Sequence, residues 1–379
     1  MKVTIYALHL GFGGVEKYVS NIANMLSEKH EVRIVSTYKM KDEPAFYLKP
    51  DVEVEYLITD LKPNREEFHN AIKQKNIPAI IREGYKSIKV LILKKKLNIR
   101  SIKECNDDAI ISTRNFHNYL IGKYADSNIV KIATEHNHHN DNEKYINDVI
   151  NSCRGFDYFL PVSKELCDFY KDKMDEINVK TRYIRYGLDE GIISQKPVHD
   201  TDDIIYVGRL SKEKGVYELL DVFNSVLIKK NGVKLHIVGD GAEAEEMKNR
   251  VSELNINDKV VFHGFRNKEY IYELLTHCAV YLMTSYTESF GIVLLEAMSC
   301  GIPCVAYDSA QGAKEIIKND YNGYLIENRN KEFITDKIIT IIENKEIFYH
   351  LSENALKTAD LFTYENTKKG WLSLLDEIN

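Results

Sequence analysis

Two glutamates flank a predicted strand-to-helix turn in the second half of the chain. The run Glu288–Gly301 reads ESFGIVLLEAMSCG and follows an apolar segment, Val280–Met283, that predicts a strand. A helix that starts near Gly291 would point free backbone N–H groups and partial positive charge at a bound diphosphate. Glu288 would then reach sugar hydroxyls, and Glu296, one turn on, would accept both hydroxyls of a ribose. The alternative is two solvated glutamates beside a helix start.

A pair of cations forms the second candidate. The segment GRLSKEKG follows the apolar run Ile204–Val207 and opens another predicted helix. Arg209 and Lys214 would lie at the carboxyl edge of a sheet, where fixed cations offset charge on a departing diphosphate. Arginine binds phosphate through two hydrogen bonds, whereas lysine acts as a point charge. The alternative, an exposed basic cluster, is unfavourable at a helix N-terminus and requires a compensating anion.

The first half of the chain carries weaker signals. The loop GFGGVEKY is a weak phosphate cradle, without the spacing of a dinucleotide fingerprint or a P-loop. His136 ends a predicted strand, where it would hydrogen-bond a sugar. His138 and His139 next to it suggest a metal site less well, and both are equally well explained as ordinary surface residues. Arg114 and Asn115 also follow a strand, and on position alone they are candidates to bind an acceptor.

The elements that must position these residues alternate between strands and helices, which predicts parallel α/β sheets. A polar stretch with Pro197 separates two such arrays. We therefore expect an α/β fold of two Rossmann-like domains with a cleft between them, residues 1–188 and 189–362, and a final helix, 363–379, on the first domain. The predicted strands are Val3–Leu8, Val32–Ser36, Ala109–Ser112, Ile129–Thr134, Tyr158–Val162, Ile204–Val207, Leu235–Val238, Val260–His263, Val280–Met283 and Pro303–Ala306.

Composition limits the function further. The chain has 379 residues, with 44% hydrophobic and 28% charged side chains, which is typical of a globular protein. A net charge of -6 argues against a general nucleic-acid binder. The six cysteines form no CxxC pair, so we expect no zinc site and a reducing compartment. No apolar run approaches the ~20 residues that span a bilayer, and the opening residues predict a strand rather than a signal peptide.

One basic segment points to a partner. Lys86–Lys103 contains seven lysines and arginines, no acid, and interleaved apolar residues. A basic amphipathic helix can lie on an anionic membrane, gaining about 1 kcal/mol per cation near the surface. The alternative is a solvated helix face. We expect peripheral binding at the cytoplasmic side of the membrane and a membrane-bound or lipid-linked acceptor.

Taken in order, GRLSKEKG, IVGDG, VVFHGF and ESFGIVLLEAMSCGIPCVA resemble the retaining glycosyltransferases of the GT-B type, group 1, family 4. In the first half only GGVEKY and the His136 region match well. The resemblance implies catalysis by Glu288, His136, Arg209 and Lys214. It implies donor binding by Gly13, Gly14, Arg209, Lys214, Arg266, Glu288, Phe290, Gly291, Ile292 and Glu296.

The same resemblance implies a UDP-sugar donor, a glycan or lipid-linked acceptor, retention of configuration, and neither a cofactor nor a metal. Tyr186 departs from the family, which often has asparagine there, so a linker contact by that residue is in doubt. Two rivals remain open: a nucleotide-sugar epimerase of the same architecture, and a non-catalytic nucleotide-sugar-binding protein. A dehydrogenase is disfavoured because no GxGxxG follows either opening strand.

Overall fold

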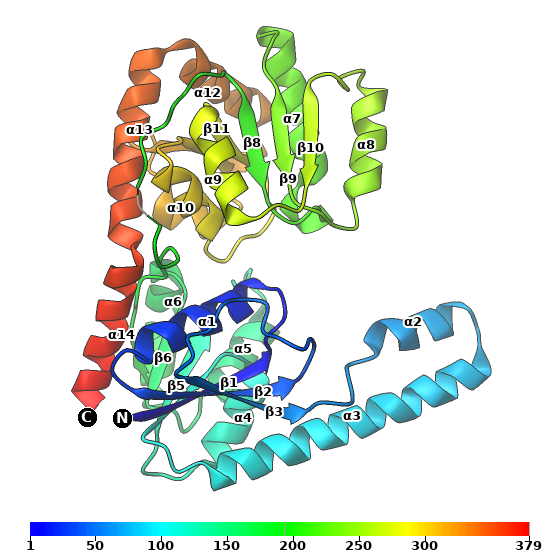
Figure 1. The fold of residues 1–379 in the computed structure, drawn as a ribbon, viewed down its shortest axis with the longest axis vertical. Helices are drawn as coiled ribbons and strands as arrows, with labels where there is room; N and C mark the ends of the chain where they lie inside the picture. The colour runs from blue at the N-terminus through cyan, green and yellow to red at the C-terminus, as the bar shows by residue number, and fades with distance from the viewer. Residues whose placement is uncertain (193, 379) are drawn as a thin grey trace. The chain divides into compact units, whose positions relative to one another are not determined.

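The computed structural model describes residues 1–192 and 194–378, which fold as two compact units (Figure 1). Unit 1 comprises Met1–Val162, Leu166–Ile184 and the segment from Lys368 onward, and unit 2 comprises Ser163–Glu165 and Arg185–Thr367. The sequence predicts domain boundaries after residues 188 and 362. In the structure the chain passes from unit 1 to unit 2 after residue 184 and returns to unit 1 after residue 367.

Unit 1 is built on a seven-stranded parallel sheet in the order β3-β2-β1-β4-β5-β6-β7. Its strands are β1 (Lys2–His9), β2 (Glu31–Tyr38), β3 (Val52–Ile58), β4 (Ala109–Ser112), β5 (Val130–Glu135), β6 (Tyr158–Pro161) and β7 (Lys180–Thr181). Its helices are α1 (Gly14–Leu26), α2 (Arg65–Lys73), α3 (Ile77–Glu104), α4 (Asn115–Tyr124), α5 (Glu143–Ser152), α6 (Lys164–Asp175) and the later part of α14 (Tyr364–Ile378).

Unit 2 has a six-stranded parallel sheet in the order β10-β9-β8-β11-β12-β13. Its strands are β8 (Ile204–Val207), β9 (Leu235–Val238), β10 (Val260–Gly264), β11 (Val280–Met283), β12 (Cys304–Tyr307) and β13 (Gly323–Ile326). The α-helices are α7 (Val216–Lys229), α8 (Ala244–Glu253), α9 (Lys268–His277), α10 (Ile292–Ser299), α11 (Ala313–Ile316), α12 (Lys331–Glu343) and α13 (Lys345–Ala359). Short 3-10 helices are η1 (Lys212–Lys214), η2 (Glu327–Arg329) and η3 (Asp360–Phe362).

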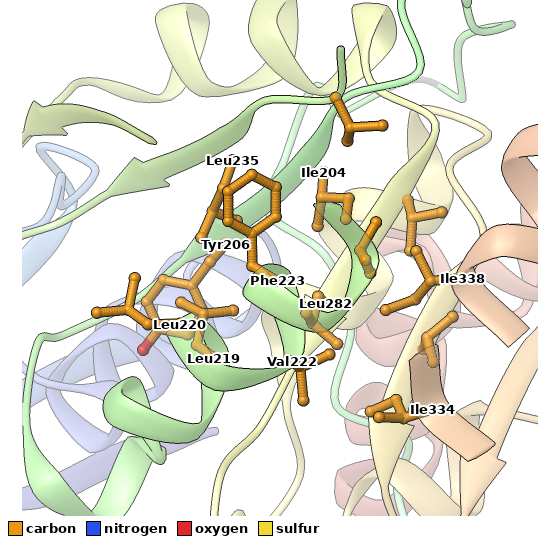
Figure 2. Packing of buried hydrophobic residues seen from close by; sticks show 14 of the residues in the cluster. Ile204, Tyr206, Leu219, Leu220, Val222, Phe223, Leu235, Leu282, Ile334 and Ile338 are labelled. Carbon is orange, nitrogen blue, oxygen red and sulfur yellow. The ribbon is translucent and has the colours of Figure 1, made fainter. Parts of the chain in front are cut away.

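The core of unit 2 shows why its elements assemble (Figure 2). Helix α7 buries Leu219, Leu220 and Phe223, whose three- and four-residue spacing places them on one face. They belong to one buried cluster with Ile204 and Tyr206 of β8. Each such side chain contributes about 1.5–3 kcal/mol when it leaves water. This packing fixes β8, and therefore the loop that follows it.

Both sheets reverse their strand order beside their first strand. From β1 the chain adds β2 and β3 on one side and then returns to place β4 on the other side; β8 and β11 have the same relation in unit 2. Connections leave such a point toward opposite faces, so a crevice opens at the carboxyl ends of the two central strands. Each unit therefore offers one switch point where a ligand can bind.

Helix α3 extends from unit 1 past the edge of its sheet, with α2 alongside (Figure 1). Asn76 starts it by accepting a hydrogen bond from the Ala79 N–H at 3.1 Å, and a proline stands in the first turn. Its middle is held by Val90, which is buried in a small cluster with Tyr38 and Ile58 of the sheet. No helix in the described ranges is both long enough and apolar enough to cross a membrane.

Candidate active site

At the switch point of unit 2, Lys214 and Glu288 form an ion pair. Lys214 ends η1 after β8, and Glu288 lies in the loop after β11, so the two central strands each supply one charge. Their side chains are only 21% and 19% exposed. The structure thus brings together two residues that are 74 positions apart in the sequence. Glu288 therefore supplies the anion that a cation near the start of a helix requires.

Backbone contacts lock the two loops together. Gly215 adopts a left-handed φ of 64°, and a Cβ there would collide with the carbonyl oxygen of Thr284. The Thr284 hydroxyl donates to the carbonyl of Gly215 at 2.9 Å, and the Tyr286 N–H donates to the carbonyl of Glu213 at 2.9 Å. A glycine is needed at 215 because the start of α7 passes so close to the end of β11.

Arg329, which the sequence did not single out, contacts the loop after β11 and holds it in place. Its guanidinium donates to the carbonyls of Thr284 at 2.8 Å and Ser285 at 3.0 Å, and to the Ser309 hydroxyl at 2.6 Å. It also pairs with Glu218 of α7 and lies 4.0 Å from the ring centroid of Tyr286. Arg329 therefore ties the segment leading to Glu288 to the helix that follows Lys214.

Helix α10 begins at this loop. Gly291 is its N-cap with a φ of 85° and has no side chain with which to cap the first turn, so the leading N–H groups can meet a ligand. Phe290 is buried, with its ring 5.5 Å from that of Tyr186, which leaves its backbone as the part able to contact a ligand. Glu296 is half-buried one turn on; burial, and after it the charge of Glu296, raises the pKa of Tyr272.

The remaining predicted donor residues of unit 2 are less constrained. Arg209 is 70% exposed, and its guanidinium is 3.7 Å from the Glu213 carboxylate. Arg266 is exposed, with its guanidinium 5.0 Å from the ring centroid of Tyr270. Ile292, the first residue of α10, is half-buried. Neither cation is joined to the Lys214–Glu288 pair by a direct contact in the described part of the chain.

In unit 1, His136 follows β5 and is half-buried. Its Nε2 lies 2.8 Å from the Thr134 hydroxyl, and its ring is 4.3 Å from that of Tyr18. Burial, assisted by the charge of Arg114, lowers the pKa of His136 to about 3. The imidazole is therefore neutral at physiological pH and can exchange hydrogen bonds without carrying charge.

The surface interpretation of His138 and His139 is wrong. Both are buried, their rings stack 4.4 Å apart, and His139 stacks on Phe169 at 3.9 Å. Their local hydrogen bonds, from the N–H groups of Asn140 and Asp141, close tight turns. The two rings fill space between β5 and α6, which sequence position alone did not indicate.

The glycine loop before α1 contains two different glycines. A Cβ on Gly13 would meet the carboxylate of Glu16, so a larger residue there would require the Glu16 side chain to move. At Gly14 a Cβ would meet nothing within 4 Å, and the residue is exposed. Nothing in the described fold of unit 1 explains a glycine at 14, which agrees with a position that a ligand approaches.

Arg114 and Asn115 stand at the switch point of unit 1, directly after β4. The guanidinium of Arg114 is 3.2 Å from the Glu16 carboxylate, and Asn115 donates to Asp148 at 2.7 Å. Both residues line a cavity of about 260 Å³ that Glu135 also borders. Burial raises the pKa of Glu135. Glu135 was not singled out by the sequence motifs.

Comparison with known proteins adds family information. Residues 190–358 match the family model described as glycosyl transferases group 1. An N-acetylgalactosaminyltransferase of Campylobacter jejuni, whose name specifies a diphospho-undecaprenol acceptor, is 24% identical over 91% of each chain. An exopolysaccharide phosphotransferase of Streptomyces coelicolor is 22% identical, and the present chain spans 41% of its length.

Solved structures extend the likeness to the whole chain. The lipopolysaccharide outer core galactosyltransferase WaaB superposes with a TM-score of 0.72 at 20% identity, covering 100% of this chain and 99% of that one. The Anabaena protein HepE, solved in complex with UDP, gives 0.73 at 18% identity with complete coverage of both. The two parallel α/β units thus have the two-domain GT-B fold, as the sequence predicted.

Proposed function

We propose that the chain, whose residues 190–358 match the model of the group 1 glycosyl transferases, is a retaining glycosyltransferase acting on a nucleotide-diphosphate sugar, a UDP sugar by preference. The observation that carries this is the Lys214–Glu288 pair beside the uncapped start of α10. HepE was solved with UDP, which supports the choice of donor. Family 4 is the subgroup that the motifs resemble.

In this proposal the diphosphate binds at the start of α10. The helix N-terminus attracts the anion, and Lys214 and Arg209 offset the negative charge that grows on it as the sugar leaves. Glu288 accepts hydrogen bonds from hydroxyls of the transferred sugar, and Glu296 accepts those of the ribose. Because the chain itself supplies two cations, the reaction requires no divalent metal and no cofactor. Gly13 and Gly14, Arg266, and the backbone of 290–292 complete the donor contacts.

The acceptor is a glycan or a lipid-linked molecule in the synthesis of a cell-surface polysaccharide or glycoconjugate. The names of WaaB and of the Campylobacter and Streptomyces relatives support this class. The acceptor hydroxyl attacks the sugar on the face that the diphosphate leaves, and a phosphate oxygen takes its proton. His136, being neutral, hydrogen-bonds the sugar near the reacting carbon.

Turnover of nucleotide sugars tests the donor site. Glu288→Ala and Lys214→Ala should fold but release UDP at least 100-fold more slowly with acceptor present. Lys212→Ala, on the exposed side of the same 3-10 turn, is the matched control and should retain wild-type turnover. Added EDTA should not change the rate. Product mass distinguishes transfer from epimerisation, and near-normal turnover of either site variant would refute the assignment.

We further propose that α3 holds the protein on an anionic membrane at the cytoplasmic side. Its outer face exposes apolar side chains at three- and four-residue spacing, each more than half exposed: Ile77, Ile81, Tyr85, Ile88 and Ile92. Exposed cations flank them, including Lys89, Lys96 and Arg100. The surface thus begins before the predicted Lys86–Lys103 segment, and Lys94 within that segment is turned away from it, into the cavity of unit 1.

Vesicle sedimentation tests this surface. Wild-type protein should sediment with vesicles containing phosphatidylglycerol at low salt, and less so with neutral vesicles. Ile81→Asp together with Ile88→Asp should abolish sedimentation, while a double change of exposed residues elsewhere, Ile228→Asp with Tyr349→Asp, should not. Equal sedimentation of wild-type and the α3 variant would exclude α3 as the contact.

A further inference from the structure

The cavity at the switch point of unit 1 combines residues from five elements, one of which is α5 with Tyr145. Leu8 comes from β1, Arg114 and Asn115 from the start of α4, Glu135 from the end of β5, and Lys94 from the inner side of α3. Its volume of about 260 Å³ is below the ~300–1,000 Å³ usual for whole small molecules. It is therefore sized for one unit of a larger ligand, such as a single sugar or polyol residue.

Lys94 is a cation without a counter-ion in this cavity. Its ammonium lies 3.6 Å from the ring centroid of Phe116, and nowhere in the described ranges does it pair with a carboxylate. Burial, together with the neighbouring charge of Arg114, lowers the pKa of Lys94. The two lysines that follow it in the chain differ, since Lys95 and Lys96 are exposed. A half-buried cation lacking an anion raises the energy of the folded state unless something else benefits from it.

Arg114 and α4 add to the positive potential. Glu16 contacts one terminal nitrogen of the guanidinium at 3.2 Å, while the buried Nε of Arg114 has no hydrogen-bond acceptor. Arg114 is also the N-cap of α4, whose first turn contains no acid and receives no side-chain cap. Free N–H groups of a ten-residue helix thus face the same cavity as the two cations. All three features favour an anion.

The opposite wall suits hydroxyl groups. The Oε1 atom of Glu135 already accepts the N–H groups of His136 and Asn137 and the hydroxyl of Tyr145, at 2.7 to 3.0 Å. Its second oxygen has no partner among the described residues, and it can accept from a ligand hydroxyl. The carboxylate would repel an anion placed directly against it. The cavity therefore distinguishes two ends of a ligand.

From this arrangement we infer that the cavity binds an acceptor unit carrying both hydroxyls and an anionic group, a phosphate or a carboxylate. Lys94 and Arg114 hold the anionic group at the α4 end, and Glu135 orients a hydroxyl at the β5 end. That the bound molecule is an acceptor rests on the proposed glycosyl transfer. The binding of such a ligand to this cavity does not depend on that proposal. It assigns Lys94 to ligand recognition rather than to the membrane surface of α3.

Titration calorimetry on the full chain, with UDP present at saturation to occupy unit 2, tests the inference. The probes are glucose, glucose 6-phosphate, glucuronate and inorganic phosphate at low salt. Glucose 6-phosphate or glucuronate should bind at least tenfold tighter than glucose, and whichever is tighter identifies the anionic group. Lys94→Met should weaken that binding tenfold or more. Lys144→Met, an exposed lysine next to Tyr145, is the matched control and should leave it unchanged.

Glu135→Gln tests the two ends of the cavity separately. It should weaken the binding of glucose 6-phosphate and leave the binding of inorganic phosphate unchanged. Thermal unfolding provides a second readout. Lys94→Met should unfold at the wild-type temperature or higher, since it removes an uncompensated charge, and Lys94→Gln should reproduce the binding loss. Equal binding of glucose and glucose 6-phosphate would overturn the inference, as would equal weakening by Lys94→Met and Lys144→Met.

The same samples keep this inference apart from the proposed function. If UDP binds and sugar is transferred to neutral acceptors as readily as to anionic ones, the anion site is refuted and the transferase stands. If glucose 6-phosphate binds through Lys94 but no nucleotide sugar binds or turns over, the transferase is refuted and the site stands.

Discussion

The two switch points have the same topology but differ in how their cations are paired. In unit 2 each buried cation has an acid beside it, Glu288 for Lys214 and Glu218 for Arg329. In unit 1 Arg114 is paired with Glu16, but Lys94 has no acid beside it in the described residues, and His117 and His136 are held neutral. Strand order decides where a ligand can bind, and side-chain pairing decides which ligand. In unit 2 a bound ligand would replace one partner of an existing ion pair. In unit 1 a bound anion would supply the counter-ion that Lys94 lacks.

The largest effect should come from breaking the paired site. Lys214→Met and Glu288→Gln should each slow sugar transfer about 100- to 1,000-fold, as expected when one fixed charge at a transition state is lost. The double variant should be little slower than either single one, because the two side chains act as a unit. Single-turnover UDP release measures all three. Multiplicative losses would show that the pair is incidental.

Arg329 should come next. Replacing it by Met leaves Glu218 unpaired and frees the carbonyls of Thr284 and Ser285, so the free energy of unfolding should fall by about 3 kcal/mol. The maximal rate should fall more than UDP affinity, because the loop before Glu288 loses its orientation. Arg329→Lys should recover part of the stability and little of the rate. Denaturant unfolding and transfer kinetics give the two readouts.

Acid should affect unit 1 before unit 2. His117 is fully buried, and burial lowers its pKa to about 3, well below that of an unfolded histidine near 6.5. The unfolded chain therefore binds a proton that the folded chain does not bind. The free energy of unfolding consequently falls as the pH drops below about 6.5. Between pH 6.5 and 5 the loss should be about 2 kcal/mol. Hydrogen exchange at both pH values should show it in α4 and β2, and His117→Gln should reduce it.

Two glycines give the smallest contrast. Gly215→Ala should destabilise unit 2, because the methyl group meets the Thr284 carbonyl and the backbone has a positive φ. Gly14→Ala should change the free energy of unfolding by less than about 0.5 kcal/mol, since the methyl group enters open space. It should nevertheless weaken donor use. Unchanged turnover in Gly14→Ala would remove Gly14 from the donor site.

Much of the fold was predictable from short apolar runs. Four predicted strands have the observed bounds, β4, β8, β9 and β11, because buried parallel strands are continuous apolar segments bounded by polar turns. Strand β3 was missed because it alternates Val52 and Val54 with glutamates at the sheet edge. Strand β7 was missed because it is only two residues long, and β13, which begins at a glycine, was missed as well.

The site was predictable only where a motif is local. Lys214 and Glu288 each stood out in a short segment, but their contact depends on β8 and β11 being neighbours. Arg329 lies more than forty positions beyond the carbonyls it holds, in a segment without any motif. Lys94, Lys95 and Lys96 are identical in type, and only the packing of α3 on the sheet turns the first inward. Burial cannot be read from residue type in such a run.

The division of the chain has a consequence for its biosynthesis. Unit 2 is continuous from Arg185 to Thr367 apart from Ser163–Glu165, whereas unit 1 takes its final segment from Lys368 onward. That segment contributes the fully buried Trp371 and pairs Lys368 with Glu28 at 2.8 Å. During translation, unit 2 can therefore reach its native structure while unit 1 still lacks a part of its core. The sheet of unit 1 therefore stays partly uncovered until α14 has been made, and during this interval it is exposed to chaperones.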